Sequence, residues 1–309
     1  MKTTALYYSD IFLEHNVPNG HPENKNRIKF ILKKIKESNI KNLKFKIAKP
    51  ANHKILKLGH SDRYINWLNE LKPENEIIRI DQDTFMSPKT LEAAKVGVGS
   101  LIDAIDNVLE KKYKNAFCLI RPPGHHAEKE KAMGFCFFST VGIGAKYLKK
   151  VKKNYKIAVV DFDVHHGNGT QDVLYNDPDC LFISIHQNNL FPFTGETNET
   201  GIQNNIINIP VDAYKTRIKF RDIVDDIIIP RLIKFKPNFL LISAGFDGHK
   251  EDQISQTKWE ESDFIYITKQ LKTLAKQYCE DRIVSFLEGG YNLEKLSTCC
   301  VSHLKTLME

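Results

Sequence analysis

The chain has 309 residues, 41% of them hydrophobic and 27% charged, and its formal net charge is +7. These values suit a soluble globular protein, and no apolar run is long enough to cross a bilayer, which excludes a membrane protein. The first residues lack the apolar core of a signal peptide, so we expect a cytoplasmic location, or a nuclear one in a eukaryote. No feature of the sequence indicates an oligomeric state.

The basic residues and the cysteines favour no special chemistry. Lysine-rich runs such as 148–156 are typical of solvated helix ends, and no aromatic stacking surface accompanies them, so nucleic-acid binding is not expected. The six cysteines form no C-x-x-C pair, which predicts reduced, buried thiols rather than zinc ligands.

In chain order, short β-branched apolar runs alternate with amphipathic segments of helical spacing. The apolar runs predict strands at 5–9, 115–120, 155–163, 180–186, 205–211, 239–247 and 283–290. The amphipathic segments predict helices that include 27–38, 90–112, 217–235 and 261–279. Because no repeat or linker interrupts this pattern, we predict a single domain over residues 1–309 with an α/β fold. Its central, mostly parallel sheet should carry helices on both faces.

Unusual polar motifs follow several of these strands. They read "RPPGHHAE" after 115–120, "DFDVHHGNG" at the end of 155–163, "SAGFDGHKED" at the end of 239–247, and "EGGYN" at the end of 283–290. In open α/β sheets, ligands bind outside the carboxyl ends of the strands. The motifs therefore predict one shared pocket at this edge of the sheet.

The second and third of these motifs have the composition of a metal site. Residues two apart in an extended strand point to the same side, so Asp161, Asp163 and His165 should share a face. Carboxylate and imidazole are good Zn²⁺ ligands, and Asp247 at the end of another strand is the natural third ligand. Three protein ligands leave a position open for water, as a catalytic site requires.

The spacing favours one metal over two. A two-metal ureohydrolase site would need D-x-H-x-D and D-x-D motifs to supply bridging carboxylates. Here Gly167 takes the fifth position of the first motif, and the second reads Asp247-Gly248-His249. We therefore expect a single catalytic metal.

The motif "RPPGHHAE" places His125 and His126 side by side in a Pro-Pro-Gly loop. Adjacent side chains diverge in a strand, so a loop is needed to direct both imidazoles into one pocket. Histidine is the side chain best suited to moving protons near neutral pH, and the pair therefore predicts acid–base chemistry.

Together these motifs resemble the histone deacetylase superfamily, and most closely its class II and bacterial histone-deacetylase-like/acetylpolyamine amidohydrolase branch. The blocks that carry the resemblance occur in the family's order from about residue 10 to about residue 293. They are "HPENKNRI" (21–28), "RPPGHHAE", "GFCFFST" (134–140), "VVDFDVHHGNGTQ" (159–171), "FISIHQ" (182–187), "SAGFDGHKED" and "EGGYN". The resemblance implies an arginase/deacetylase-like fold and hydrolysis of an acetylated amine to acetate and free amine.

The resemblance also implies a role for each matched residue. One Zn²⁺ per chain, or Fe²⁺ in cells, would be held by Asp163, His165 and Asp247. His126 would act as general base and then acid beside its partner His125. Asp161 would orient His125, and Asn168 would orient His126. Tyr291 would polarise the substrate carbonyl and stabilise its oxyanion.

Substrate-binding and ion-binding positions are implied in the same way. An apolar tunnel for an acetyl-lysine side chain would be formed by Gly134, Phe135, Phe191, Ile254, Gly289 and Gly290. A structural K⁺ or Na⁺ would be bound by Asp161, Asp163, His165 and Ser184.

We therefore expect a zinc-dependent deacetylase that acts on N-acetyl-lysine in an acetylated protein or peptide. One alternative is an acetylpolyamine amidohydrolase, which would need rim carboxylates to bind a distal ammonium; the candidates are Glu196, Glu199, Glu251 and Asp252. Another alternative is a module that binds acetyl-lysine without turnover. The rim loop reads "FPFTGE" (191–196) where relatives usually have "YPGTG", so the substrate preference is open.

Overall fold

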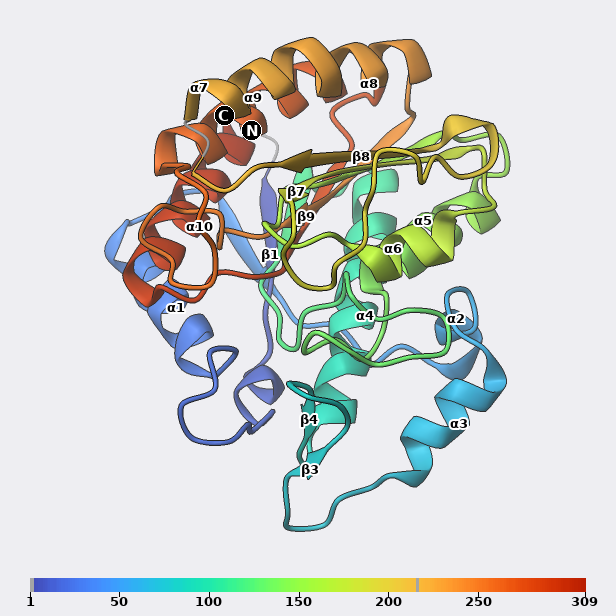
Figure 1. The fold of residues 1–309 in the computed structure, drawn as a ribbon, viewed down its shortest axis with the longest axis vertical. Helices are drawn as coiled ribbons and strands as arrows, with labels where there is room; N and C mark the ends of the chain where they lie inside the picture. Colours follow the sequence, from blue (N-terminus) through green and yellow to red (C-terminus); the bar gives the residue numbers. More distant parts are fainter. Residues whose placement is uncertain (1–2, 215–216) are drawn as a thin grey trace.

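The computed structural model describes residues 3–214 and 217–309. Its centre is an eight-stranded sheet with the order β2-β1-β5-β10-β9-β6-β7-β8, in which all neighbours are parallel (Figure 1). Its strands are β1 (Thr4–Tyr7), β2 (Leu43–Lys46), β5 (Asn115–Cys118), β6 (Ile157–Asp161), β7 (Cys180–Gln187), β8 (Ile206–Val211), β9 (Phe239–Ala244) and β10 (Ile283–Leu287). A small antiparallel ribbon, β3 (Ile78–Arg79) with β4 (Phe85–Met86), lies outside it. The last strand, β10, is inserted between β5 and β9.

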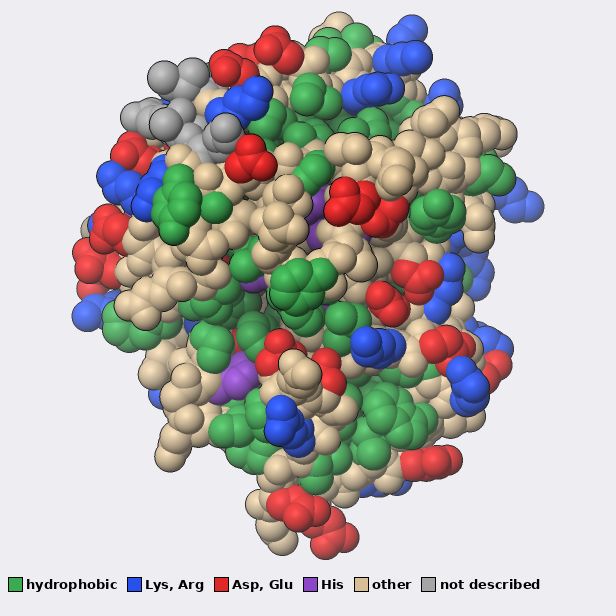
Figure 2. All heavy atoms as spheres, in the orientation of Figure 1, with side chains coloured by type: hydrophobic (Ala, Val, Ile, Leu, Met, Phe, Trp, Pro, Cys, Tyr) green, Lys and Arg blue, Asp and Glu red, His purple; other side chains and the backbone are tan. Residues whose placement is uncertain are grey.

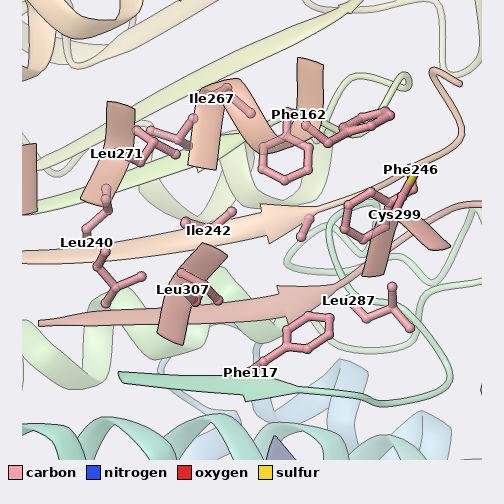
Figure 3. Close-up of a cluster of buried hydrophobic side chains, with 14 of the residues drawn as sticks. Phe117, Phe162, Leu240, Ile242, Phe246, Ile267, Leu271, Leu287, Cys299 and Leu307 are labelled. Carbon is pink, nitrogen blue, oxygen red and sulfur yellow. The ribbon is translucent and has the colours of Figure 1, made fainter. Parts of the chain in front are cut away.

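Helices cover both faces of the sheet, as expected for strands that are apolar throughout. The helices are α1 (Asn26–Glu37), α2 (His53–Leu56), α3 (Asp62–Glu70), α4 (Thr90–Leu109), α5 (Thr140–Val151), α6 (Asn168–Leu174), α7 (Arg217–Ile223), α8 (Ile229–Phe235), α9 (Glu261–Tyr278) and α10 (Leu293–Met308). One buried cluster joins the sheet to α1 and α7–α10, and a second joins it to α4, α5 and α6. Figure 3 shows part of the first cluster, in which Phe162 and Phe246 pack against α9 and α10 side chains.

The predicted α/β fold with a parallel sheet is confirmed, and a strand overlaps each predicted run, but β9 ends at Ala244 and leaves Asp247 in the loop beyond it. The 155–163 strand, however, ends at Asp161, so Asp163 and His165 lie in the loop beyond it. The predicted 217–235 helix is α7, a π-helical turn at Val224–Ile228, and α8. Pro230 lacks the N–H of a regular helical turn, and the wider turn just before it accommodates that loss.

Two further expectations can be compared with the structure. All six cysteines are buried and unpaired. Within residues 3–214 and 217–309, no helix combines the length and apolarity that a membrane span requires.

Candidate metal centre and active site

The polar motifs meet because the strands that precede them are neighbours. β5, β10, β9 and β6 are consecutive in the parallel sheet, so their carboxyl ends lie along one edge. Figure 2 shows histidine atoms near the middle of one face of the molecule, between hydrophobic side chains. The predicted convergence of these loops on one site is what the fold produces.

Asp163, His165 and Asp247 form a buried group whose candidate ligand atoms all lie within 4.8 Å of one another. His165 Nδ1 lies 3.0 Å from Asp163 Oδ1 and 3.1 Å from Asp247 Oδ2. Strand alternation does not produce this arrangement, because the strand has already ended at Asp161. The loop is shaped instead by hydrogen bonds such as that from the His165 N–H to Asp163 Oδ1, at 2.9 Å.

Backbone donors fix both carboxylates of the group. The Gly289 N–H donates to Asp163 Oδ2 at 2.8 Å, and the Val164 N–H donates to Asp247 Oδ1 at 2.9 Å. A Cβ at position 289 would lie 2.2 Å from Asp247 Oδ2, so only glycine allows the backbone this close. The carboxylates are thus held in place while oxygen atoms of both remain beside the imidazole.

The charges of this group fit a divalent cation. The carboxylates of Asp163 and Asp247 outweigh burial and raise the pKa of His165 to about 10. Burial, and then the charge of Asp163, raises the pKa of Asp247 to about 6. The group therefore attracts positive charge strongly, and its set of two carboxylates and one imidazole is one that Zn²⁺ accepts.

The adjacent histidines differ sharply in their surroundings. His125 Nδ1 lies 3.0 Å from Asp161 Oδ2, and His126 Nδ1 lies 2.8 Å from Asn168 Oδ1. Burial acts to lower the pKa of His125, but the carboxylates of Asp163 and Asp161 raise it to about 10. Burial, with His125 and His165 nearby, instead holds the pKa of His126 well below 6.5. The surroundings therefore favour the charged form of His125 and the neutral form of His126.

Aromatic rings lie beside His126 and beside Tyr291. The Phe191 ring lies 5.1 Å from that of His126, and the Phe135 ring lies 6.0 Å from that of Tyr291. Burial raises the pKa of Tyr291 well above 10; Arg27 opposes this shift, and the carboxylates of Asp247 and Asp163 add to it. The phenol therefore stays protonated at neutral pH, and the charges of the proposed metal ligands contribute to its raised pKa.

The structure places the other predicted positions around this site. Gly134 has φ +55°, and a Cβ there would lie 2.4 Å from the His126 ring. Ile254 is partly buried, and its N–H donates to Asp252, whose carboxylate also accepts the Tyr291 N–H. Ser184 pairs with Asp161 across β6 and β7, while its hydroxyl contacts His186 Nδ1 at 2.9 Å.

Sequence reasoning assigned no role to a buried ionic cluster beneath the Tyr291 loop. Glu23 and Arg121 form two hydrogen bonds, at 2.6 and 2.8 Å, and Arg27 donates to Glu23 at 2.9 Å. Arg27 also donates to the carbonyls of Gly290, at 2.7 Å, and Glu288. Arg27 and Glu23 belong to the block "HPENKNRI". The charged residues of this block are the sequence feature from which the buried cluster could have been suspected.

Glu288 is a second residue that sequence reasoning missed. It is fully buried, and its Oε2 accepts the N–H groups of Gly124, at 2.8 Å, and His125, at 3.2 Å. Burial raises its pKa to about 7. This side chain therefore joins the loop after β10 to the loop that carries both histidines.

Comparisons with known proteins agree with this geometry. A family model described as the histone deacetylase domain matches residues 21–307. "Type-2 histone deacetylase 2" of Dictyostelium discoideum is 38% identical over 100% of this chain, which spans only 21% of that protein. "Histone deacetylase 14, chloroplastic" of Arabidopsis thaliana is 33% identical over 98% of this chain and 76% of its own length. "Probable deacetylase" of Archaeoglobus fulgidus is 33% identical over 94% of this chain and 82% of its own length.

A solved structure shares the whole architecture. The crystal structure of the HDA15 HD domain superposes with a TM-score of 0.92 at 26% identity, covering 99% of this chain and 88% of that one. The similarity therefore extends over the sheet, the helices and the loops that form the site.

Proposed function

The chain belongs to the histone deacetylase family, and on that premise we propose that it is a Zn²⁺-dependent deacetylase of N-acetyl-lysine in proteins or peptides. Membership places it among the hydrolases of amide bonds. The observation that carries the proposal is the buried group of Asp163, His165 and Asp247 beside two histidines whose Nδ1 atoms are bonded to Asp161 and Asn168.

The three-residue group would hold one Zn²⁺, with Fe²⁺ as the alternative in cells. When bound, the cation supplies Lewis acidity, which polarises an acetyl carbonyl and lowers the pKa of the attacking water. All three side chains are buried, so water competes poorly with these ligands.

His126 is the residue suited to moving the proton. Its Nδ1 is bonded to Asn168, which leaves Nε2 to accept a proton from water and pass it to the leaving amine. The low pKa of His126 keeps it neutral and ready to accept that proton. His125 is oriented by the Asp161 carboxylate, which with Asp163 raises the pKa of its imidazole and favours the charged form.

Tyr291 is the proposed donor to the substrate carbonyl. Its raised pKa keeps the phenol protonated, so its hydroxyl can stabilise a developing oxyanion. Arg27 supports the Tyr291 ring from one side, with its guanidinium carbon 5.0 Å from the ring centroid. The Asp252 carboxylate accepts the Tyr291 N–H and fixes the backbone on which the phenol is carried.

The positions of two aromatic rings favour a substrate with a narrow aliphatic side chain. Phe191 lies against the proposed base and Phe135 against the proposed phenol, so the two are suited to the walls of a tunnel for an acetyl-lysine side chain. Ile254 and Gly290 are proposed at its edge, next to Tyr291.

Three of the four candidate rim carboxylates give little support to a polyamine substrate. Asp252 is buried and accepts backbone N–H groups, and Glu251 pairs with Lys295 at 3.1 Å. Glu199 accepts the N–H groups of Gly195 and Glu196. These three carboxylates are already engaged, which leaves Glu196, an exposed residue, as the remaining candidate for a distal ammonium.

The test is acetate release from an acyl-lysine peptide panel and from acetylated putrescine and spermidine, with and without chelator. We expect turnover of acetyl-lysine peptides that chelation abolishes and Zn²⁺ restores. Strong preference for a polyamine would overturn the substrate assignment. No turnover of any substrate by metal-replete protein would leave a binding module as the better description.

Three expectations from the sequence remain part of this proposal. A K⁺ or Na⁺ ion would lie near Asp161, Asp163, His165 and Ser184. Residues 1–309 would form one deacetylase domain, and the protein would act in the cytoplasm on acetylated substrates.

A further inference from the structure

The side-chain amide of Asn168 lies between one ring nitrogen and several acceptors. Its Oδ1 accepts a hydrogen bond from His126 Nδ1 at 2.8 Å. Its Nδ2 donates to Glu128 Oε1 at 2.7 Å, and more weakly to Met133 Sδ and the His126 carbonyl, both at 3.4 Å. The two ends of the amide thus meet opposite kinds of partner.

The direction of this amide determines which nitrogen of His126 carries the proton. With oxygen toward Nδ1, the imidazole holds its proton there, and Nε2 is free to accept one. With the amide reversed, its NH₂ would need a lone pair at Nδ1, and the proton would move to Nε2. A carboxylate at position 168 would accept from Nδ1 in either rotamer, whereas asparagine needs another group to select its direction.

Glu128 can make that selection because a carboxylate only accepts hydrogen bonds. Its bond to the Asn168 NH₂ is charge-assisted and about twice as strong as a neutral one, whereas the sulfur and the carbonyl are distant. We propose that Glu128 is a positioning residue that fixes the Asn168 amide and thereby keeps the Nε2 lone pair of His126 free. This rests on the proposed function, in which His126 is the base.

The surrounding backbone holds Glu128 in place for this role. A tight turn is closed by the Glu128 N–H bonding the Lys131 carbonyl at 2.9 Å, with the reciprocal bond at 3.3 Å. The next residue's N–H donates to Asp172 on α6, the helix that begins at Asn168. The turn and the amide therefore keep a constant separation.

Water could fill the space left by the Glu128 side chain, but it would not orient the Asn168 amide. Glu128 and Asn168 both line a surface hollow of about 420 Å³, so water would replace a shortened side chain. Water donates as readily as it accepts, so it imposes no direction on the amide. The protein should stay folded while the amide samples both orientations.

The kinetic test is a double-mutant cycle. We expect Glu128→Leu to lower kcat about tenfold, with KM nearly unchanged. Glu128→Gln keeps an acceptor and should lose less. In an Asn168→Asp background, Glu128→Leu should not lower kcat, because no amide is left to direct and the substitution removes a carboxylate that would face the new one. The matched control is Glu130→Gln, at an exposed carboxylate paired with Arg63, and it should behave as wild type.

An equal kcat loss from Glu128→Leu in both backgrounds would mean a general structural role, and it would overturn the inference. A second readout does not depend on turnover. Long-range ¹H–¹⁵N spectra of labelled protein should show His126 protonated at Nδ1 in the wild type and in Glu130→Gln, and a tautomer mixture in Glu128→Leu. If Glu128→Leu keeps the Nδ1 proton, the inference is wrong. A tautomer change in a protein that hydrolyses no acyl substrate would support the inference while refuting the proposed function.

Discussion

The carboxylate of Asp163 accepts the backbone N–H of Gly289 at 2.8 Å, which joins the loop after β6 to the loop after β10. Asp163 is thus held by a backbone N–H of that loop rather than by a side chain. Any atom added at position 289 meets both proposed carboxylate ligands.

We therefore predict that Gly289→Ala lowers metal affinity by about 10- to 100-fold, the range typical of changes to groups that orient ligands. The new Cβ would lie 2.2 Å from Asp247 Oδ2 and 2.6 Å from Asp163 Oδ2. Metal content after dialysis at fixed free Zn²⁺ measures the effect. Gly97→Ala, in helix α4, is the control, because its nearest neighbours would be at 3.9 Å and the metal should be retained.

Tyr291→Phe should lower kcat by about 10²- to 10³-fold, the usual cost of losing one donor to an oxyanion. The Phe ring keeps its packing against Phe135 and Arg27, so the free energy of unfolding should be unchanged. Steady-state kinetics and denaturant unfolding test the two parts separately. A variant with wild-type kcat would remove Tyr291 from the mechanism.

Glu23→Gln should destabilise the fold by about 3–5 kcal/mol, because it leaves two buried guanidinium groups without their counter-charge. Glu23, Arg27 and Arg121 are all fully buried. The measurement is the free energy of unfolding in urea. Glu37→Gln, which affects an exposed pair with Lys33 at 3.9 Å, is the control and should leave stability unchanged. Equal stability of the two variants would contradict the prediction.

His303 should make the protein sensitive to acid. The ring is fully buried between the hydroxyls of Thr268 and Ser285, and burial lowers its pKa from 6.5 to about 3. Below pH 6.5 the unfolded chain binds a proton here that the folded chain refuses until about pH 3, so stability falls as the pH drops through this window.

His303→Gln should remove about 2 kcal/mol of the stability difference between pH 7 and pH 5. Urea unfolding at both pH values, with the metal content held equal, provides the measurement. A wild-type slope in the variant would show that other buried groups, such as His60 with its pKa of about 4, account for the acid sensitivity.

Sequence reasoning could find the strands and the proposed metal ligands because each signal is local. The strand β6 is an uninterrupted apolar run, and Asp163 and His165 follow it directly. The strand β2, "LKFK", is short and half-exposed, so it resembles the neighbouring lysine-rich loops and was not predicted. Local patterns also brought Asp247 to the right edge of the sheet, although β9 ends at Ala244 and Asp247 lies in the loop beyond it.

Residues whose role depends on a partner far away in the sequence are not marked by any local sequence pattern. Glu23 and Arg121 are 98 positions apart, and Arg27 lies 263 positions from the Gly290 carbonyl that it contacts. Each is an ordinary charged residue until the fold buries it. Likewise, Glu128 gains its importance only from the 2.7 Å contact with Asn168, which is 40 positions away.

The insertion of β10 between β5 and β9 has a consequence for biosynthesis. Until β10 leaves the ribosome, the sheet can form only as two blocks, β2-β1-β5 and β9-β6-β7-β8. Each block ends in a bare edge of unpaired backbone groups that can recruit a wrong strand. The nascent chain thus remains prone to aggregation until β10 has been made, and chaperone demand should peak just before β10 emerges.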